Sequence, residues 1–436
     1  MRTDRVRIAF KTLGCRLNQY ETEVMKERLR RAGFTIVEPD EEADLFIINT
    51  CTVTARAEAK ARQYIHRFAR RGPVLVTGCW ATVAPEEALR EGATLVFGNA
   101  AKLEVVELVW RALAGERGSI ELKGHQIAEE RIARDSEHTR AFVKVQDGCD
   151  RFCTYCRTIF ARGRSRSKPL EVVVAEVKGL VRNGYREVVL TGIDLADYMK
   201  DPRALPELLW ALDAIPGLER IRLSSLNPQG VTPELAEFFR ESRKACPYFH
   251  IPLQSGDDAL LRRMNRGYTV AEYREKVALL REEVPNATFG ADVMVGFPGE
   301  TEESFERTCK LVEEVGFIRL HIFRYSPRPG TAAARFPDQV PEGVKRARLE
   351  RLRELGREVG LRAKREFLGR VLRVLVEEQT PEGHWRGWTE NYLDVHLPGE
   401  LRPGQIIPVR LERVAAEGHL YGRMAALAAV GVGSDN

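Results

Sequence analysis

The sequence predicts an α/β protein with a small all-β part at its C-terminal end. Three observations support this prediction. Apolar strand-like runs alternate with helical periods over the first 115 residues, the alternation resumes near residue 139, and beyond Gly369 apolar and polar residues alternate one by one. A chain of 436 residues is too long for a single core. We therefore expect domains at 1–115, 139–367 and 368–428, with a polar linker at 116–138.

The N-terminal domain is predicted to be a parallel sheet of Rossmann-like type, because its strands alternate with helices. The strand-like runs are VRIAFKTLG, DLFIINT, PVLVTG and ATLVFGN. The helical segments between and after them are NQYETEVMKERLRRAGF, ARAEAKARQYIHRFARR, PEEALREG and KLEVVELVWRALAG.

The central domain contains six further strand-like runs, and helical segments lie between them. The runs are AFVKVQDG, EVVLTG, RIRLSSL, YFHIPLQSG, FGADVMVGFPG and LHIFRYSP. Six units are too few for a closed eight-unit barrel, so an open, partial (β/α)6 barrel is expected. Residues 341–367 are predicted to form a helix whose acidic and basic residues pair on a solvated face.

Short runs of period two follow Gly369, namely RVLRVLVEE, HWRGWTENYLDVHL and QIIPVRLERVAAEGHLYGRM. Glycine and proline turns separate them, which is typical of a small all-β barrel.

Composition limits the possible functions. The net charge of +5 and the pI of about 8.7 permit nucleic-acid binding without requiring it. The N-terminal residues lack a secretory pattern, and no run of about 18 apolar residues predicts a membrane span. The cytoplasm is the expected location. Thiols there stay reduced, so the eight cysteines are expected to be buried fillers, metal ligands or catalytic groups.

Three cysteines fall in one predicted loop, as Cys149-x3-Cys153-x2-Cys156. A structural zinc site needs four ligands, and no fourth Cys or His lies nearby in the sequence. Three thiolates suit a [4Fe–4S] cluster with one iron left open. The loop follows the first barrel strand, at the end of the barrel where active sites lie.

Three more cysteines each follow a predicted strand of the N-terminal domain: Cys15, Cys51 and Cys79. The carboxyl ends of parallel strands share one edge of a sheet, so these thiols are expected to converge. They predict a second cluster with an open iron. Cys246 and Cys309 have no such spacing and are expected to be structural.

The two cysteine sets resemble the methylthiotransferase family of radical S-adenosylmethionine (SAM) enzymes. Blocks along nearly the whole chain are similar to that family, among them LGCRLNQYE, NTCTVT, VTGC, FCTYC, RGRSRS, HIPLQSGDD, DVMVGFPGE and YSPRPGT. The resemblance implies a methylthiotransferase domain, a radical SAM barrel and a TRAM barrel. The NQYE that follows Cys15 is most similar to the branch acting on N6-threonylcarbamoyladenosine of tRNA.

The resemblance also implies a reaction, which is insertion of a methylthio group at C2 of adenosine 37. It implies two [4Fe–4S] clusters and two SAM molecules per turnover, one as methyl donor and one as radical source. The implied partners are the tRNA anticodon loop and an electron donor such as flavodoxin or ferredoxin. The sequence departs from the family at Arg157, Thr158 and Ile159, where two apolar residues and a proline are usual.

Further site residues follow from the resemblance and from charge. Those expected to contact SAM are Tyr155, Gly192, Ser225, Gln254 and Asp292, with barrel packing as the alternative. Those expected to contact RNA are Asn18, Gln19, Arg162, Arg164, Arg166, Lys168, Trp388 and Tyr392. The basic residues could instead tune the cluster or be solvated, and the aromatic ones could belong to the core of the C-terminal barrel.

Two other hypotheses remain open at this point. One is the same chemistry on a different modified adenosine or on a side chain of a ribosomal protein. The other is a non-catalytic zinc protein that binds RNA.

Overall fold

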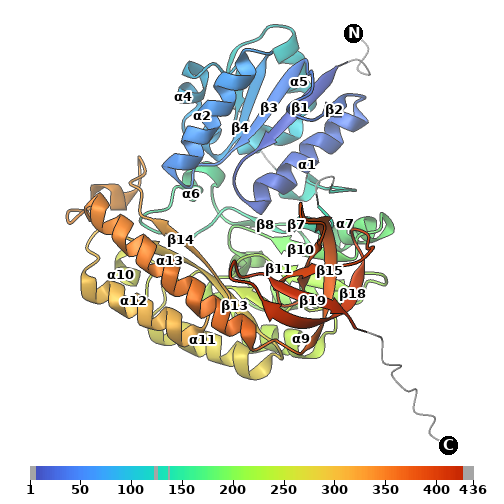
Figure 1. The fold of residues 1–436 in the computed structure, drawn as a ribbon. Helices are drawn as coiled ribbons and strands as arrows, with labels where there is room; N and C mark the ends of the chain where they lie inside the picture. The colour runs from blue at the N-terminus through green and yellow to red at the C-terminus, as the bar shows by residue number, and fades with distance from the viewer. Residues whose placement is uncertain (1–5, 122–125, 136–137, 426–436) are drawn as a thin grey trace, which may run out of the picture.

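The computed structural model describes residues 6–121, 126–135 and 138–425. A parallel sheet with helices on both faces, an open barrel and a small closed barrel follow one another along the chain (Figure 1). This confirms the predicted fold class. Parts of the predicted linker (122–125 and 136–137) and the end of the predicted third domain (426–428) lie outside the described residues.

Six parallel strands form the N-terminal sheet in the order β2-β1-β3-β4-β5-β6. The strands are β1 (Arg7–Thr12), β2 (Thr35–Val37), β3 (Leu45–Thr50), β4 (Val74–Gly78), β5 (Leu95–Phe97) and β6 (Gly118–Ile120). One face packs on α1 (Arg16–Arg31) and α5 (Val105–Leu113). The other face packs on α2 (Ala55–Ala69), α3 (Cys79–Val83) and α4 (Pro85–Arg90). The domain is therefore a three-layer sandwich.

The sheet has two strands that the sequence pattern did not predict, β2 and β6. Both are three-residue edge strands without a fully buried residue, so neither shows an apolar run. The prediction that a linker begins at residue 116 is wrong at this point, because Gly118–Ile120 complete the sheet.

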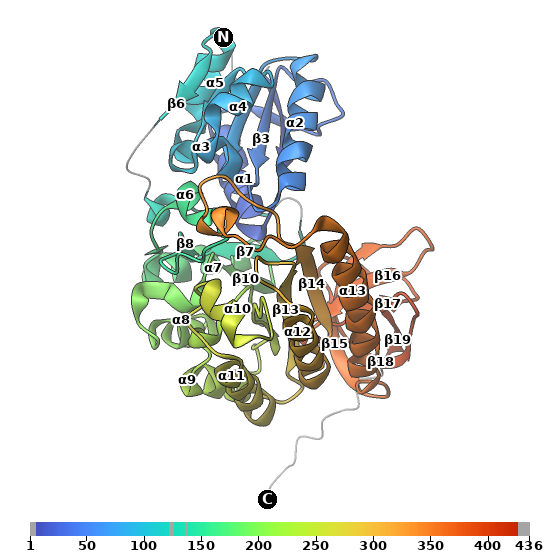
Figure 2. The same cartoon turned by 90° about the vertical axis from the view of Figure 1, so that its left-hand side faces the viewer.

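The central domain is an open barrel of six parallel strands with helices on its outer side (Figure 2). The strands form two three-stranded sheets, β11-β10-β7 and β12-β13-β14, and a bridge between Ile221 and Ala245 connects them. The strands are β7 (Ala141–Lys144), β10 (Glu187–Thr191), β11 (Arg220–Leu223), β12 (Tyr248–His250), β13 (Thr288–Val295) and β14 (Arg319–Arg324). Because β7 and β14 do not pair, the barrel is open on one side.

Helices cover the outside of this barrel, and their apolar faces fill one large core with the strands. They are α7 (Leu170–Arg182), α8 (Ala204–Asp213), α9 (Pro233–Glu241), α10 (Asp258–Arg263), α11 (Val270–Glu283), α12 (Glu302–Val315) and α13 (Glu342–Arg365). Between β7 and α7, the short strands β8 (Gln146–Asp147) and β9 (Arg166–Ser167) enclose the helix α6 (Thr158–Arg162).

The C-terminal barrel closes in the order β15-β16-β17-β19-β18 and packs against the central barrel. Its strands are β15 (Val371–Gln379), β16 (Trp385–Thr389), β17 (Asp394–Leu397), β18 (Ile406–Val414) and β19 (Leu420–Met424). Two fully buried arginines of β11, Arg220 and Arg222, donate hydrogen bonds to its backbone carbonyls. Both also pair with Glu187 of β10, so the contact is polar and specific.

A stack of three aromatic rings lies where the domains meet. Tyr392 stacks on Tyr248 and on Trp388, with ring centroids 4.6 and 4.5 Å away. Arg16, at the start of α1, donates a hydrogen bond of 2.9 Å to the Tyr392 hydroxyl. The first helix of the chain therefore contacts its last domain.

This environment changes the acidity of Tyr392. Burial disfavours the phenolate, but the guanidinium groups of Arg16, Arg140, Arg222 and Arg319 together lower the pKa to about 8. Between this pKa and the ordinary value near 10, unfolding takes up a proton, so folding stability rises with pH in that interval.

We expect Tyr392→Phe to remove this dependence. Relative to the variant, the wild-type chain should gain about 1–3 kcal/mol of stability between pH 8 and pH 10. Urea unfolding at both pH values and phenolate absorbance at 295 nm test this. A Tyr392 phenolate that appears only near pH 10 in the folded protein contradicts the prediction.

No helix in the described part of the chain combines the length and the apolar character needed to cross a membrane.

Candidate active site

The loop after β8 carries Cys149, Cys153 and Cys156 at one end of the open barrel. Cys153 is buried and the other two are partly buried. A hydrogen bond from the backbone N–H of Cys156 to the Cys153 carbonyl tightens the loop. The expected position, at the start of the barrel, is thus observed.

Cys15, Cys51 and Cys79 follow β1, β3 and β4, which are neighbours in the sheet. Two glycines permit this approach. Gly14 has φ +103°, and a Cβ atom there would lie 2.8 Å from the Cβ of Cys51. Gly78 has φ +96°, and a Cβ atom there would overlap the carbonyl oxygen of Thr50. The sheet edge therefore brings the three thiols toward one another.

The spacing of the thiols bears on which metal centre they suit. Zinc–sulfur bonds of about 2.3 Å place tetrahedral thiolates about 3.8 Å apart. Among the described residues, only two groups have three ligand atoms within 4.8 Å of one another, and neither cysteine set is one of them. An iron–sulfur cube instead takes one thiolate at each iron, so three thiols suit three of its four corners.

Polar N–H groups point at five of the six sulfurs. The donors are the backbone N–H groups of Val53, Arg151 and Thr158, toward Cys51, Cys149 and Cys156, and the side chains of Arg266 and Asn99, toward Cys153 and Cys79. Such bonds stabilise thiolate ligands. Burial raises the pKa of Cys51 and of Cys149 to about 12, so a bound metal has to displace their protons.

A cavity of about 340 Å³ opens beside the three central cysteines. It is bounded on one side by barrel residues and on the other by Thr52, Val53 and Thr54, which directly follow Cys51. A molecule in this cavity therefore contacts both the barrel loop and the N-terminal sheet edge.

Four of the five residues predicted to contact SAM line this cavity, namely Tyr155, Ser225, Gln254 and Asp292. Gln254 adopts a left-handed backbone with φ +63°, and its Oε1 is buried without a partner among the described residues. An unpaired buried acceptor of this kind fits the amino group of a ligand. Gly192 does not line the cavity. It packs against Gln146, beside the lining residue Ile193.

Asp292 lies between two histidines of the neighbouring strands. Its oxygens are 3.2 Å from Nε2 of His250 and 3.3 Å from Nδ1 of His321. Burial disfavours the carboxylate, but hydrogen bonds from both histidines hold the pKa of Asp292 well below its usual range. The cavity therefore contains an ionised carboxylate.

Five of the residues predicted to bind RNA are buried instead. Lys168 pairs with Glu176, and Arg162 pairs with Glu21 and Asp147. The other three are Asn18, Trp388 and Tyr392. The prediction of RNA contact is wrong for these five, because protein groups already occupy their polar atoms and aromatic faces.

The remaining basic residues of this loop are more accessible. The Arg164 side chain is 70% exposed, and its guanidinium lies 4.6 Å from the ring centroid of the exposed Phe152. Arg166 is partly exposed and lies 3.5 Å from Asp147. Gln19 is half-buried on α1. Arg164 and Arg166 thus stay available to an RNA ligand.

Helix α6 joins the two cysteine sets. It begins two residues after Cys156 and packs against α3, whose first residue is Cys79. Asn99 donates a 2.8 Å hydrogen bond to the carbonyl of Ala161 in α6, and the same amide faces Cys79. Arg162 at its end binds Glu21 of α1. One short helix thus connects both thiol sets.

Sequence reasoning missed Glu58 and Arg328, which meet at the cavity wall although they are 270 residues apart in the chain. The Arg328–Glu58 contact and the Arg157–Glu58 contact close the seam between the N-terminal and central domains. Arg328 lies in the block YSPRPGT, and the similarity of that block to the family is the sequence feature that could have indicated a role for it.

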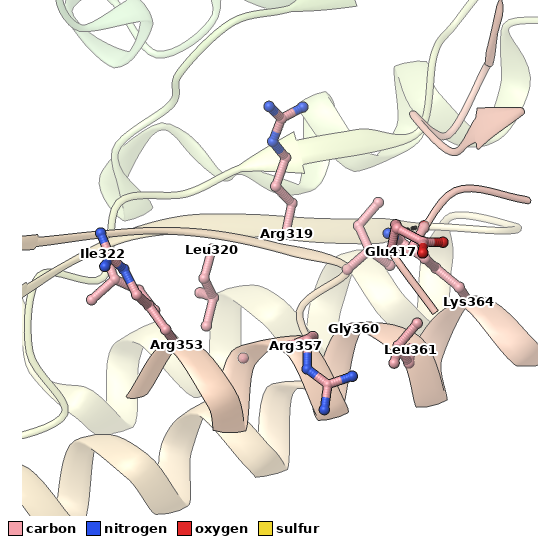
Figure 3. Close-up of a pocket in the computed structure, with 12 residues that line it drawn as sticks. Arg319, Leu320, Ile322, Arg353, Arg357, Gly360, Leu361, Lys364 and Glu417 are labelled. Carbon is pink, nitrogen blue, oxygen red and sulfur yellow. Dashed lines mark hydrogen bonds between the residues drawn. The ribbon is translucent and has the colours of Figure 1, made fainter. Parts of the chain in front are cut away.

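A second cavity, of about 240 Å³, lies between β14, α13 and the turn before β19 (Figure 3). No cysteine lines it. Arg353 and Arg357 of α13 line it and pair with Glu350 and Glu354, which confirms the predicted salt-bridged face of this helix.

Three family models match the chain. They are the Radical SAM superfamily over residues 143–312, the Uncharacterized protein family UPF0004 over residues 7–98 and the TRAM domain over residues 365–425. A solved structure of the radical SAM methyltransferase TsrM from Kitasatospora setae is similar in fold, with a TM-score of 0.57 and 15% identity over 76% of this chain and 74% of that chain.

Curated relatives extend the likeness over nearly the whole chain. Threonylcarbamoyladenosine tRNA methylthiotransferase MtaB of Thermotoga maritima is 38% identical over 94% of this chain and 95% of the relative. The same enzyme of Aquifex aeolicus is 38% identical over 93% and 100%. A tRNA-2-methylthio-N(6)-dimethylallyladenosine synthase of Thermotoga petrophila is 37% identical over 96% and 97%. With its two cysteine sets, its open barrel and these relatives, the chain belongs to the radical SAM methylthiotransferase family.

Proposed function

We propose that this chain inserts a methylthio group at C2 of N6-threonylcarbamoyladenosine at position 37 of tRNA. The observation that supports this most directly is the cavity that touches both the radical SAM loop and the residues following Cys51. The threonylcarbamoyl substrate is taken from the names of the relatives in three organisms. Because its relatives are enzymes, the hypothesis of a non-catalytic zinc protein is wrong.

Membership of the radical SAM superfamily implies one [4Fe–4S] cluster and SAM. We propose that Cys149, Cys153 and Cys156 hold that cluster, and that Cys15, Cys51 and Cys79 hold a second one. When bound, the clusters and two SAM molecules supply the radical that activates the unreactive C2–H bond and the methylated sulfur that replaces the hydrogen.

The chain itself supplies position and polarity. Gln254 and Asp292 offer acceptors to the charged amino group of SAM on the barrel side of the cavity. Arg266, which follows α10, donates to Cys153 at 3.2 Å and to Asn227, so it connects the ligand loop to the segment after β11. The N-terminal domain covers the opposite side, so the adenine is held between the two cysteine sets.

Exposed Arg164 and Arg166 and the C-terminal barrel are proposed to bind the anticodon loop, which offers phosphates and unpaired bases. A flavodoxin- or ferredoxin-type protein is the proposed electron donor. Since tRNA is the proposed substrate, the cytoplasm is the proposed place of action.

Iron analysis tests the cluster assignment. Anaerobically reconstituted protein should bind about eight iron atoms per chain if both sites hold a cube. Replacing Cys149, Cys153 and Cys156 together by alanine should halve the iron and leave the other cluster. Stoichiometric zinc without iron in the wild-type protein contradicts the assignment.

Nucleoside analysis tests the substrate. tRNA from a strain lacking this protein should contain threonylcarbamoyladenosine without its methylthio derivative, and the gene should restore the derivative. A strain that loses only the methylthio form of dimethylallyladenosine contradicts the proposed substrate while leaving the reaction class intact.

A further inference from the structure

Two guanidinium groups share one carboxylate at the wall of the cavity. Nη1 of Arg157 lies 3.3 Å from Oε1 of Glu58, and Nη2 of Arg328 contacts the same oxygen. Thr52 donates its hydroxyl to that oxygen at 2.6 Å. Neither guanidinium forms another ion pair within the described ranges, so this group carries one unbalanced positive charge.

This charge lies inside the protein. Arg328 is 4% exposed, and its Nε has no hydrogen-bond partner among the residues that the structure describes. Both arginines line the cavity. An uncompensated buried cation is unfavourable, and an anionic ligand in the cavity would relieve it.

We propose that Arg157 and Arg328 bind the carboxylate of the threonylcarbamoyl group on the target adenosine. This inference rests on the proposed function. A guanidinium binds a carboxylate through two parallel hydrogen bonds, whereas a dimethylallyl group has no polar atom to offer. A relative named for the threonylcarbamoyl substrate is 38% identical to this chain, and one named for the dimethylallyl substrate is 37% identical. Sequence identity therefore does not show which of the two substrates this chain takes. In this chain, two arginines at the cavity wall favour the substituent that carries a carboxylate.

The position of the two arginines favours the nucleoside as the source of the carboxylate. Arg157 and Arg328 meet Thr52 and Glu58 on the N-terminal side of the cavity, whereas Gln254, the unpaired acceptor suited to SAM, lies on the barrel side. Arg328 is only 4% exposed, and a backbone phosphate of RNA reaches an exposed residue more readily than a buried one. SAM also carries a carboxylate, and the experiment distinguishes it.

The test compares three anticodon stem-loop RNAs, in which adenosine 37 carries threonylcarbamoyl, its methyl ester or no substituent. Binding to the anaerobically reconstituted full-length protein is measured by fluorescence anisotropy without SAM. The wild-type chain should bind the acid form at least about tenfold more tightly than the ester, because the ester lacks the charge-assisted hydrogen bonds. Arg157→Leu should remove most of this preference.

Arg324→Leu is the matched control. Arg324 lines the same cavity but already pairs with Glu342, so its replacement should preserve the preference for the acid form. Because the ester comparison uses the wild-type chain, it remains decisive even when a variant does not fold.

Equal wild-type affinity for the acid and ester forms overturns the inference, and turnover of the acid form in the same preparation leaves the proposed function standing. An Arg157→Leu protein that keeps the preference for the acid RNA but binds SAM more weakly also overturns it, because the carboxylate is then that of SAM. Methylthiolation of a dimethylallyl RNA alone refutes the proposed function together with the inference.

Discussion

Replacing Cys15 by alanine is expected to abolish methylthio transfer while the protein continues to cleave SAM reductively. Cys15 belongs to the N-terminal set, which lies at the sheet edge, whereas the barrel loop keeps its own three thiols. The radical cluster is thus untouched, and only the proposed second cluster loses a ligand. Product and 5′-deoxyadenosine are measured in one assay by mass spectrometry.

Cys153→Ala serves as the comparison, and it should abolish both products. Its thiol is buried in the barrel loop and receives a hydrogen bond from Arg266. A Cys15→Ala protein that still forms the methylthio nucleoside removes the N-terminal cysteines from the reaction.

Replacing Glu21 by alanine is expected to destabilise the protein by about 3–5 kcal/mol, because buried Lys102 loses its acidic partner and buried Lys144 and Arg162 each lose one of theirs. Glu21 pairs with Lys102, Lys144 and Arg162, and all four side chains are at most 3% exposed. Burial opposes its ionisation, but these three cations hold the pKa of Glu21 well below its usual range. Urea unfolding followed by circular dichroism measures the loss.

Glu41→Ala is the control for this experiment. Glu41 pairs with Arg7 at the surface, where both side chains are more than a third exposed, so the expected loss is below about 1 kcal/mol. A Glu21→Ala protein as stable as the control would show that the network contributes little to holding α1 against the central domain.

The order of the domains and the place of the cysteines were predictable because both depend on local patterns. A strand pattern followed by a cysteine locates that thiol at a sheet edge, whatever the rest of the fold. The burial of Arg162 was not predictable in this way. Its partner Glu21 lies 141 residues earlier, and an arginine among other basic residues ordinarily indicates solvent or RNA.

The aromatic residues of the C-terminal barrel show a second limit. The alternation of apolar and polar residues along a strand predicts which residues share a face, but it does not predict what packs against each face. Trp388 and Tyr392 are buried because the central barrel and Arg16 pack against them. Contacts between domains therefore bury most of the residues for which the prediction of RNA contact was wrong.

The length of helix α6 determines how far apart the two proposed clusters lie. One residue inserted into Thr158–Arg162 would turn everything after it by about 100°. Arg162 would then leave Glu21, and the carbonyl of Ala161 would leave Asn99. The length of this single helical turn therefore sets the separation of the two proposed metal centres. An insertion or deletion there should uncouple them even when all six cysteines remain.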